Sequence, residues 1–284
     1  MPETALIPKA ADTLTTIRAS RGWVALNLRD LWIYRELIYF LIWRDVKVRY
    51  KQAALGVAWA VIQPVMTMVV FSIIFGKLLG VSSEGNIPYP VFSYVALLPW
   101  HLFANALQKS GISLVGNANL ITKIYFPRLV IPISSVVSGL VDFALAFLVL
   151  LGLMAYYHMP LTWNALWLPL LTLLAMATAL AVGLWLSALN VQYRDVQQMI
   201  PFLVNLWFYA SPAVYSSKII PGGFWQMVYA LNPMAGVIQG FRWALLGTQP
   251  PDITLAISTA VVLVLLVTGL FFFRRMERTF ADIV

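Results

Sequence analysis

The sequence predicts an all-α, polytopic membrane protein with six transmembrane helices, an N-terminal interfacial amphipathic helix, and a re-entrant broken helix between the fifth and sixth spans. Of its 284 residues, 61% are hydrophobic and 11% are charged, whereas a soluble domain usually carries about 25% charged residues. The apolar residues recur in several stretches near the roughly 20 residues that cross the hydrocarbon of a bilayer. The basic residues gather between these stretches on one side, which sets the orientation.

Six apolar stretches define the predicted spans. The first 30 residues lack the apolar run of about 7 to 15 residues that a signal peptide needs, so we expect the N-terminus in the cytoplasm. With that orientation 16 of the 19 lysines and arginines lie on the cytoplasmic side, as the positive-inside rule requires, and both termini are cytoplasmic. The predicted spans are residues 57–79, 90–107, 129–157, 165–189, 199–215 and 253–273.

The stretch before the first span is predicted to be an amphipathic helix in the cytoplasmic interface. It is apolar from Leu31 to Trp43 but contains Arg35 and Glu36, and it is too short to cross. Its basic residues would contact lipid headgroups. A basic anchor with no other role fits the sequence as well as a helix with a further function. The expected headgroup contacts are Arg44, Lys47, Arg49 and Lys51. The chain thus divides into a cytoplasmic segment (1–30), the interfacial helix (31–52), a transmembrane domain (53–275) and a cytoplasmic tail (276–284).

Residues 224–246 are long and largely apolar, but Asn232 and Pro233 interrupt them. Each half is too short to span, and a seventh crossing would place the basic residues that follow the last span outside. A broken element that dips in from the outer face is therefore predicted, and such an element needs protein or water around its irregular backbone.

Several kinds of chemistry are excluded or disfavoured. The chain has no cysteine, which rules out disulfides and thiolate sites, and it has no phosphate-binding G-x-x-x-x-G-K-[ST] motif. His101 and His158 are far apart and lack clustered carboxylates, so no metal, cofactor or catalytic site is expected on this chain. Asp142 lies in the middle of the third span, where we expect it to face polar groups of a neighbouring helix; coupling to ions is the alternative. The net positive charge follows from topology, and no nucleic acid partner is expected.

Three passages carry a family resemblance. They are, first, residues 44–52 with Leu55, Gly56, Trp59, Gln63 and Pro64; second, residues 119–121 with Lys123, residues 125–128, Pro132, Asp142 and Phe143; third, residues 193–196 with Pro201, Phe202, residues 207–209, Ser211, Pro212, Tyr215, residues 232–234, Phe241 and Arg242. Together they resemble the transmembrane subunit of ABC-2 exporters of lipid-linked polysaccharides such as O antigen, capsule and teichoic acid. The match covers roughly residues 30 to 275 and departs at Asn205, where glutamine is expected.

The resemblance implies a transport subunit, not an enzyme, in the bacterial inner membrane. Two copies would form the conduit for a lipid-linked polysaccharide, O antigen in particular, and two copies of a separate P-loop ATPase would carry ATP and Mg. Alternatives are capsule or teichoic acid export, or an ion-coupled secondary transporter, although the latter needs several buried ionisable groups. A membrane-embedded transferase would need clustered acids or a histidine dyad.

The resemblance also implies site residues. The stretch that matches the ATPase-coupling helix comprises Gly116, Asn117, Ala118, Asn119, Leu120, Ile121 and Lys123. The outer gate would include Phe224, Trp225, Tyr229, Asn232 and Pro233. Because apolar sugar faces stack on aromatic rings, the candidate channel wall comprises Trp59, Phe71, Phe202, Trp207, Tyr209 and Tyr215.

Overall fold

The computed structural model describes residues 28–51, 56–81, 83–85, 87–216, 223–251, 253–278 and 280. Within these residues the chain is helical and has no strand. The helices are α1 (Leu28–Ile33), α2 (Arg35–Lys51), α3 (Gly56–Phe71), α4 (Tyr89–Gly116), α5 (Ala118–Lys123), α6 (Val130–Val137), α7 (Gly139–Tyr156), α8 (Leu168–Gln192), α9 (Val196–Tyr209), α10 (Phe224–Ala230), α11 (Pro233–Leu246) and α12 (Ile253–Met276). A π-helical turn, Ser72–Leu78, extends α3, and a 3-10 turn, Trp163–Trp167, precedes α8.

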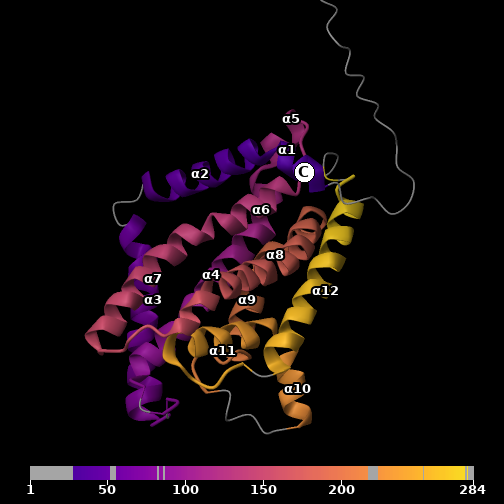
Figure 1. Cartoon of the computed structure of the whole chain (residues 1–284). Helices are drawn as coiled ribbons and strands as arrows, with labels where there is room; N and C mark the ends of the chain where they lie inside the picture. Colours follow the sequence, from indigo (N-terminus) through magenta and orange to yellow (C-terminus); the bar gives the residue numbers. More distant parts are fainter. Residues whose placement is uncertain are drawn as a thin grey trace, which may run out of the picture.

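The long helices form a bundle, with α2 and α5 at one end and α10 and α11 at the other (Figure 1). We call these the α2 end and the α11 end. Five helical stretches are long and apolar enough to cross a membrane: Ala58–Leu78, Tyr89–Gly116, Val130–Tyr156, Trp163–Gln192 and Ile253–Met276. The chain is therefore a multi-pass membrane protein, as predicted.

The second of these stretches is the centre of the bundle. In it 83% of the most apolar window is buried inside the protein, compared with 11% in the first and 17% in the last. Helix α4 contacts α3, α6, α7, α8, α9 and α11. The outer helices thus leave apolar surface for lipid, while α4 is covered by protein.

Helix α9 occupies the position of the fifth predicted span but is shorter than predicted. Its 14 residues end at Tyr209, which gives a length of about 21 Å at 1.5 Å per residue. The hydrocarbon core is about 30 Å thick. Turns follow as far as Ser216, so the count of six spans stays a prediction.

Two other boundaries differ from the sequence prediction. Helix α4 continues to Gly116, beyond the predicted end at Leu107, so Lys109 lies in the helix and not in a loop. The face that carries Ser110, Ser113 and Leu114 is buried against neighbouring helices, which extends the helix past the lysine. The interfacial helix is also divided, because α1 ends at Ile33 and α2 begins at Arg35.

The predicted break at residues 232 and 233 is confirmed. Asn232 caps α11 by accepting a hydrogen bond from the Met234 amide at 3.0 Å, and Pro233 occupies the first turn, where its missing N–H has no cost. The Ser258 hydroxyl of α12 lies 3.0 Å from the Ala230 carbonyl oxygen. Helix α11 is almost wholly buried against α4, α8 and α12, which provides the protein cover that a broken element needs.

Helix α2 packs on α6 along the α2 end of the bundle. Its Leu41 is buried, whereas Tyr39, Phe40 and Trp43 are exposed. The predicted division into an apolar face and an opposite charged face is thus wrong in part, because aromatic side chains point outward and some charged residues point inward. Residues 1–27, Gln52 and residues 281–284, which include most of the predicted cytoplasmic ends, lie outside the described residues.

Candidate functional site

The carboxylate of Asp142 on α7 is the centre of a charged cluster under α2. It accepts hydrogen bonds from Arg49 Nη1 and Tyr50 Oη of α2, and Lys109 Nζ of α4 lies 3.4 Å away. The side chains of Asp142, Arg49 and Lys109 are 17%, 24% and 33% exposed. The expectation that Asp142 faces polar groups of neighbouring helices is confirmed.

Tyr50 is held as a hydrogen-bond donor in this cluster. Burial, reinforced by the adjacent Asp142 carboxylate, raises the pKa of the Tyr50 phenol to about 12. The hydroxyl therefore keeps its proton at neutral pH. With two cations, one carboxylate and one neutral phenol, the cluster has a net charge of +1.

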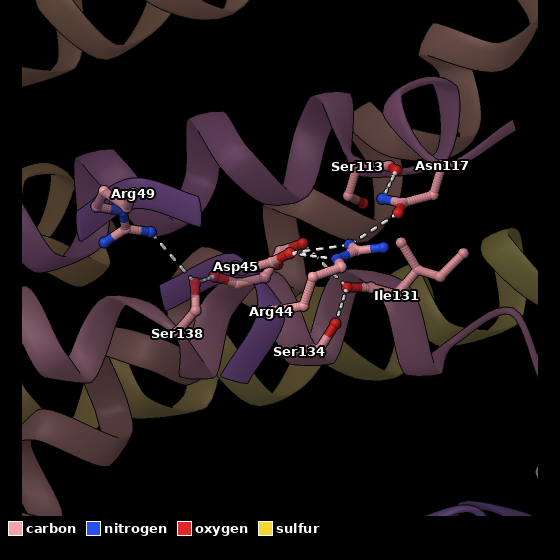
Figure 2. Close-up of polar contacts among 9 residues, drawn as sticks. Arg44, Asp45, Arg49, Ser113, Asn117, Ile131, Ser134 and Ser138 are labelled. Atoms are coloured by element: carbon pink, nitrogen blue, oxygen red, sulfur yellow. Dashed lines mark hydrogen bonds and ion pairs between the residues drawn. The ribbon is translucent and has the colours of Figure 1, made fainter. Parts of the chain in front are cut away.

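A second polar contact joins α2 to the junction of α4 and α5. Arg44 donates to Asp45 at 2.8 Å and to Asn117 Oδ1 at 2.9 Å, and the Asn117 amide donates to the Ser113 carbonyl at 2.8 Å. Figure 2 shows Arg44 between Asp45 and Asn117, with Arg49 directed to Ser138. We call the contacts of Arg44, Arg49 and Tyr50 the α2 seam.

The four residues expected at lipid headgroups therefore divide into two pairs. Arg44 and Arg49 face the protein through the α2 seam, whereas Lys47 and Lys51 are exposed on α2. Sequence reasoning missed Tyr50 and Lys109 as partners of Asp142. A lone mid-span carboxylate signals that a partner exists, but the partners lie 92 and 33 positions away.

The stretch expected to couple to an ATPase forms a short helix. Asn117 joins α4 to α5, and α5 covers Ala118–Lys123. Ile121, one of the residues expected to couple to the ATPase, is buried in this chain's own cluster with Leu41 and Leu114, while Leu120 is half-buried. The free surface consists of Gly116, Asn119, Thr122, Lys123, Ile124 and Tyr125, and the Tyr125 side chain is 91% exposed.

The aromatic residues of α9 point in two directions. Phe202 and Tyr209 lie on an exposed face together with Asn205 and Leu206, and the spacing of three, four and seven residues makes these four one stripe. We call them the α9 stripe.

The other aromatic side chains expected in a channel wall face the bundle in this chain or flank it. Trp207 Nε1 donates to Asn232 Oδ1 at 2.8 Å, and the Trp207 ring packs edge-on against Phe103 at 4.9 Å. Phe71 stacks on Phe208 at 5.7 Å. Trp59 is exposed on α3, a different helix from the one that carries the α9 stripe.

The expected outer gate lies at the α11 end, where Asn232 and Arg242 hold the chain that follows α9. The Asn232 amide donates to the Ala210 carbonyl at 3.0 Å. Arg242 is 2% exposed, donates to the Tyr215 carbonyl at 3.1 Å, and lies 3.7 Å from the centroid of the Phe92 ring, as in a cation–π contact. Phe224 and Trp225 are exposed on α10, Tyr229 and Asn232 are half-buried, and Pro233 is buried.

Comparison with known families shows which family this chain matches. A family model described as "ABC-2 type transporter" matches residues 36–246, which include the α2 seam, the α9 stripe and both halves of the broken element, α10 and α11. The chain belongs to the ABC-2 type transporter family. Members of this family are transport permeases and not enzymes, in agreement with the expectation for this chain.

Curated relatives cover most of the ABC-2 chain. It is 33% identical over 242 residues to an "O-antigen export system permease protein RfbA" of Myxococcus xanthus, which covers 84% of this chain and 91% of the relative. A protein of the same name from Klebsiella pneumoniae is 31% identical over 251 residues, or 88% and 95% of the two chains. A "Polysialic acid transport protein KpsM" of Escherichia coli is 25% identical over 253 residues, or 86% and 95%.

Proposed function

We propose that this chain is the membrane-spanning subunit of an ATP-driven exporter of lipid-linked polysaccharide, with O antigen as the polymer. The observation that carries the proposal is the similarity over most of the chain, at 31% to 33% identity, to relatives named as O-antigen export permeases. Capsule export is the second candidate, supported by the more distant polysialic acid transport protein. The chain would lie in the bacterial inner membrane with both termini in the cytoplasm.

The conduit would form between two copies of the chain. The α9 stripe supports this, because Tyr209 is 72% exposed and α9 leaves one face uncovered by its own bundle. Facing stripes would offer aromatic rings to the apolar faces of sugars and the Asn205 amide to their hydroxyls. Trp207, which is tied to Asn232, would position the stripe from behind.

Energy would come from two copies of a separate P-loop ATPase that binds ATP and Mg. The exposed side of α5 and the segment directly after it support docking there, with Lys123 at the end of α5 and Tyr125 beyond it as the contact residues. A displacement of α5 would reach α4 through Asn117 and α2 through the hydrogen bond between Arg44 and Asn117. The α2 seam would then carry the motion to α7 through Asp142.

Affinity purification of the tagged chain from its own host tests the proposal. We expect a P-loop ATPase to co-purify in equal amount and the chain to appear twice per complex in native mass spectrometry. Deletion of the gene should leave O antigen inside the cell while capsule is unaffected. Recovery of the chain without an ATPase, or normal surface O antigen in the deletion strain, would reject the proposal.

A further inference from the structure

A cavity of about 360 Å³ opens between α3, α4 and α7, beneath the end of α2. Its polar lining consists of Arg49, Gln63, His101, Asn105 and Asp142, with Trp59 beside them. On α4 and α7 the lining residues recur at intervals of three and four, so one face of each helix is turned to the cavity. The remaining lining residues are apolar or glycine.

The polar side chains of this cavity are unusual because four of them belong to helices that can cross a membrane. Gln63 lies in the first of these stretches, His101 and Asn105 in the second, and Asp142 in the third, where a polar group without a partner is costly. His101 Nε2 is buried and has no hydrogen-bond partner among the described residues. Buried polar atoms normally have a partner, so the cavity offers an unmet polar contact to a ligand.

The charged cluster beside the cavity favours an anion. Arg49 and Asp142 line the cavity as an ion pair, and Lys109, which is outside the lining, lies 3.4 Å from Asp142 and gives the cluster a net charge of +1. Arg49 has five N–H donors, and its described contacts use one on Nη1 and one on Nη2. A guanidinium with free donors beside amides is suited to a phosphate.

We propose that this cavity binds the phosphoryl headgroup of an anionic membrane lipid. The phosphate lies at Arg49, the hydroxylated group attached to it contacts Gln63, His101 and Asn105, and the tail leaves past the exposed Trp59 into the bilayer. A glycerophospholipid and a lipid-linked saccharide share this chemistry. The site goes beyond the proposed conduit, because α9 contributes nothing to its lining.

The chain has no cysteine, so a single thiol can report on the cavity. We would place Gln63→Cys in the lining and Met66→Cys on the exposed face of α3 as the matched control. Each variant would be reconstituted in nanodiscs of phosphatidylcholine alone, with phosphatidylglycerol, or with a polyprenyl-diphosphate-linked disaccharide. A further sample would contain phosphatidylcholine and inorganic phosphate. The measured quantity is the rate of labelling by a small maleimide.

We expect at least one anionic lipid to slow labelling of Gln63→Cys threefold or more while Met66→Cys is unchanged. The lipid that protects identifies the source of the headgroup. In a Gln63→Cys background, His101→Leu and Asn105→Ala should each reduce the protection to less than 1.5-fold, and unchanged labelling in phosphatidylcholine alone shows that the fold is intact.

Four results would overturn the proposal. The first two are protection of Gln63→Cys by neither anionic lipid and protection by inorganic phosphate alone. The others are equal slowing of labelling at Met66→Cys, and full protection in folded chains that carry His101→Leu or Asn105→Ala. The measurement needs neither ATPase nor export. Its failure in a chain that exports polymer therefore rejects the lipid site alone, whereas protection in a chain that exports nothing rejects only the proposed function.

Discussion

Replacing Asp142 by asparagine removes the charge to which Arg49, Tyr50 and Lys109 are directed. The amide keeps the shape of the side chain, but two cations are left without a counter-charge. Loss of one partner from a fully buried ion pair costs roughly 3 to 5 kcal/mol. Arg49 and Lys109 are 24% and 33% exposed, so water screens part of the loss. We expect the free energy of unfolding to fall by about 2 kcal/mol, as for hydrogen bonds to charged groups.

The assay is reversible unfolding by sodium dodecyl sulfate in mixed micelles, followed by helical circular dichroism. Lys47→Met is the control, because it removes an exposed cation from the same helix and should change stability by less than about 0.5 kcal/mol. The double variant Asp142→Asn/Lys109→Met should recover about 1 kcal/mol, since it also removes an uncompensated charge. Asp142→Asn within about 0.5 kcal/mol of the parent would refute the cluster as the anchor of α2.

Three further predictions concern the conduit, the packing of α11 and the topology. Tyr209→Ala should lower polymer export while the amount of protein stays normal, because it removes a stacking contact of about 0.5 to 1.5 kcal/mol. Trp207→Ala should lower the amount of protein, because it reduces the free energy of unfolding by roughly 3 to 5 kcal/mol. An immunoblot of the cell surface measures exported polymer, and an immunoblot of the membrane measures the amount of the chain. Loss of export in Trp207→Ala with normal protein, and loss of protein in Tyr209→Ala, would place the conduit on the other face of α9. Gly240→Ala would place a Cβ 2.6 Å from a leucine methyl of α8, so it should cost about 1 to 3 kcal/mol in the same unfolding assay; no loss would mean that α11 packs less closely. Tyr125→Cys should react with an impermeant thiol reagent only in inverted vesicles, and Trp163→Cys should react only in intact cells. Both side chains are exposed, and they lie at opposite ends of the bundle. Labelling of Tyr125→Cys from outside would reject the predicted orientation.

Features that depend on local sequence were predicted well. The broken element followed from Asn232 and Pro233, because a proline fixes where a helix can begin and asparagine is a good cap. The apolar stretches predicted the long helices, since only length and composition are needed to span hydrocarbon. The end of α4 was missed because Lys109 looked like the start of a loop, whereas its ammonium group lies beside the carboxylate of Asp142, 33 positions away.

Features that depend on tertiary contacts could not be predicted. Helical periodicity alone placed Arg49 among headgroup ligands, but its partner Asp142 is 93 positions away. The same limit applies to Trp207 and Tyr209, which are only two residues apart. Trp207 faces the half-buried Asn232, whereas Tyr209 faces open surface. Likewise, the sequence shows Ile121 as an apolar residue in a polar stretch, and only the fold reveals that it is already buried.

The central claim is that an ATPase bound at the exposed side of α5 drives polymer through this chain. Its most direct test is the amount of O antigen on the cell surface, measured against the amount inside, when the deletion strain carries Tyr125→Asp. Tyr125 is exposed and outside the core, so the variant should reach the membrane in normal amount. We expect it to lose co-purifying ATPase and at least tenfold of surface polymer, with polymer retained inside. Normal surface polymer with normal ATPase binding would contradict the claim.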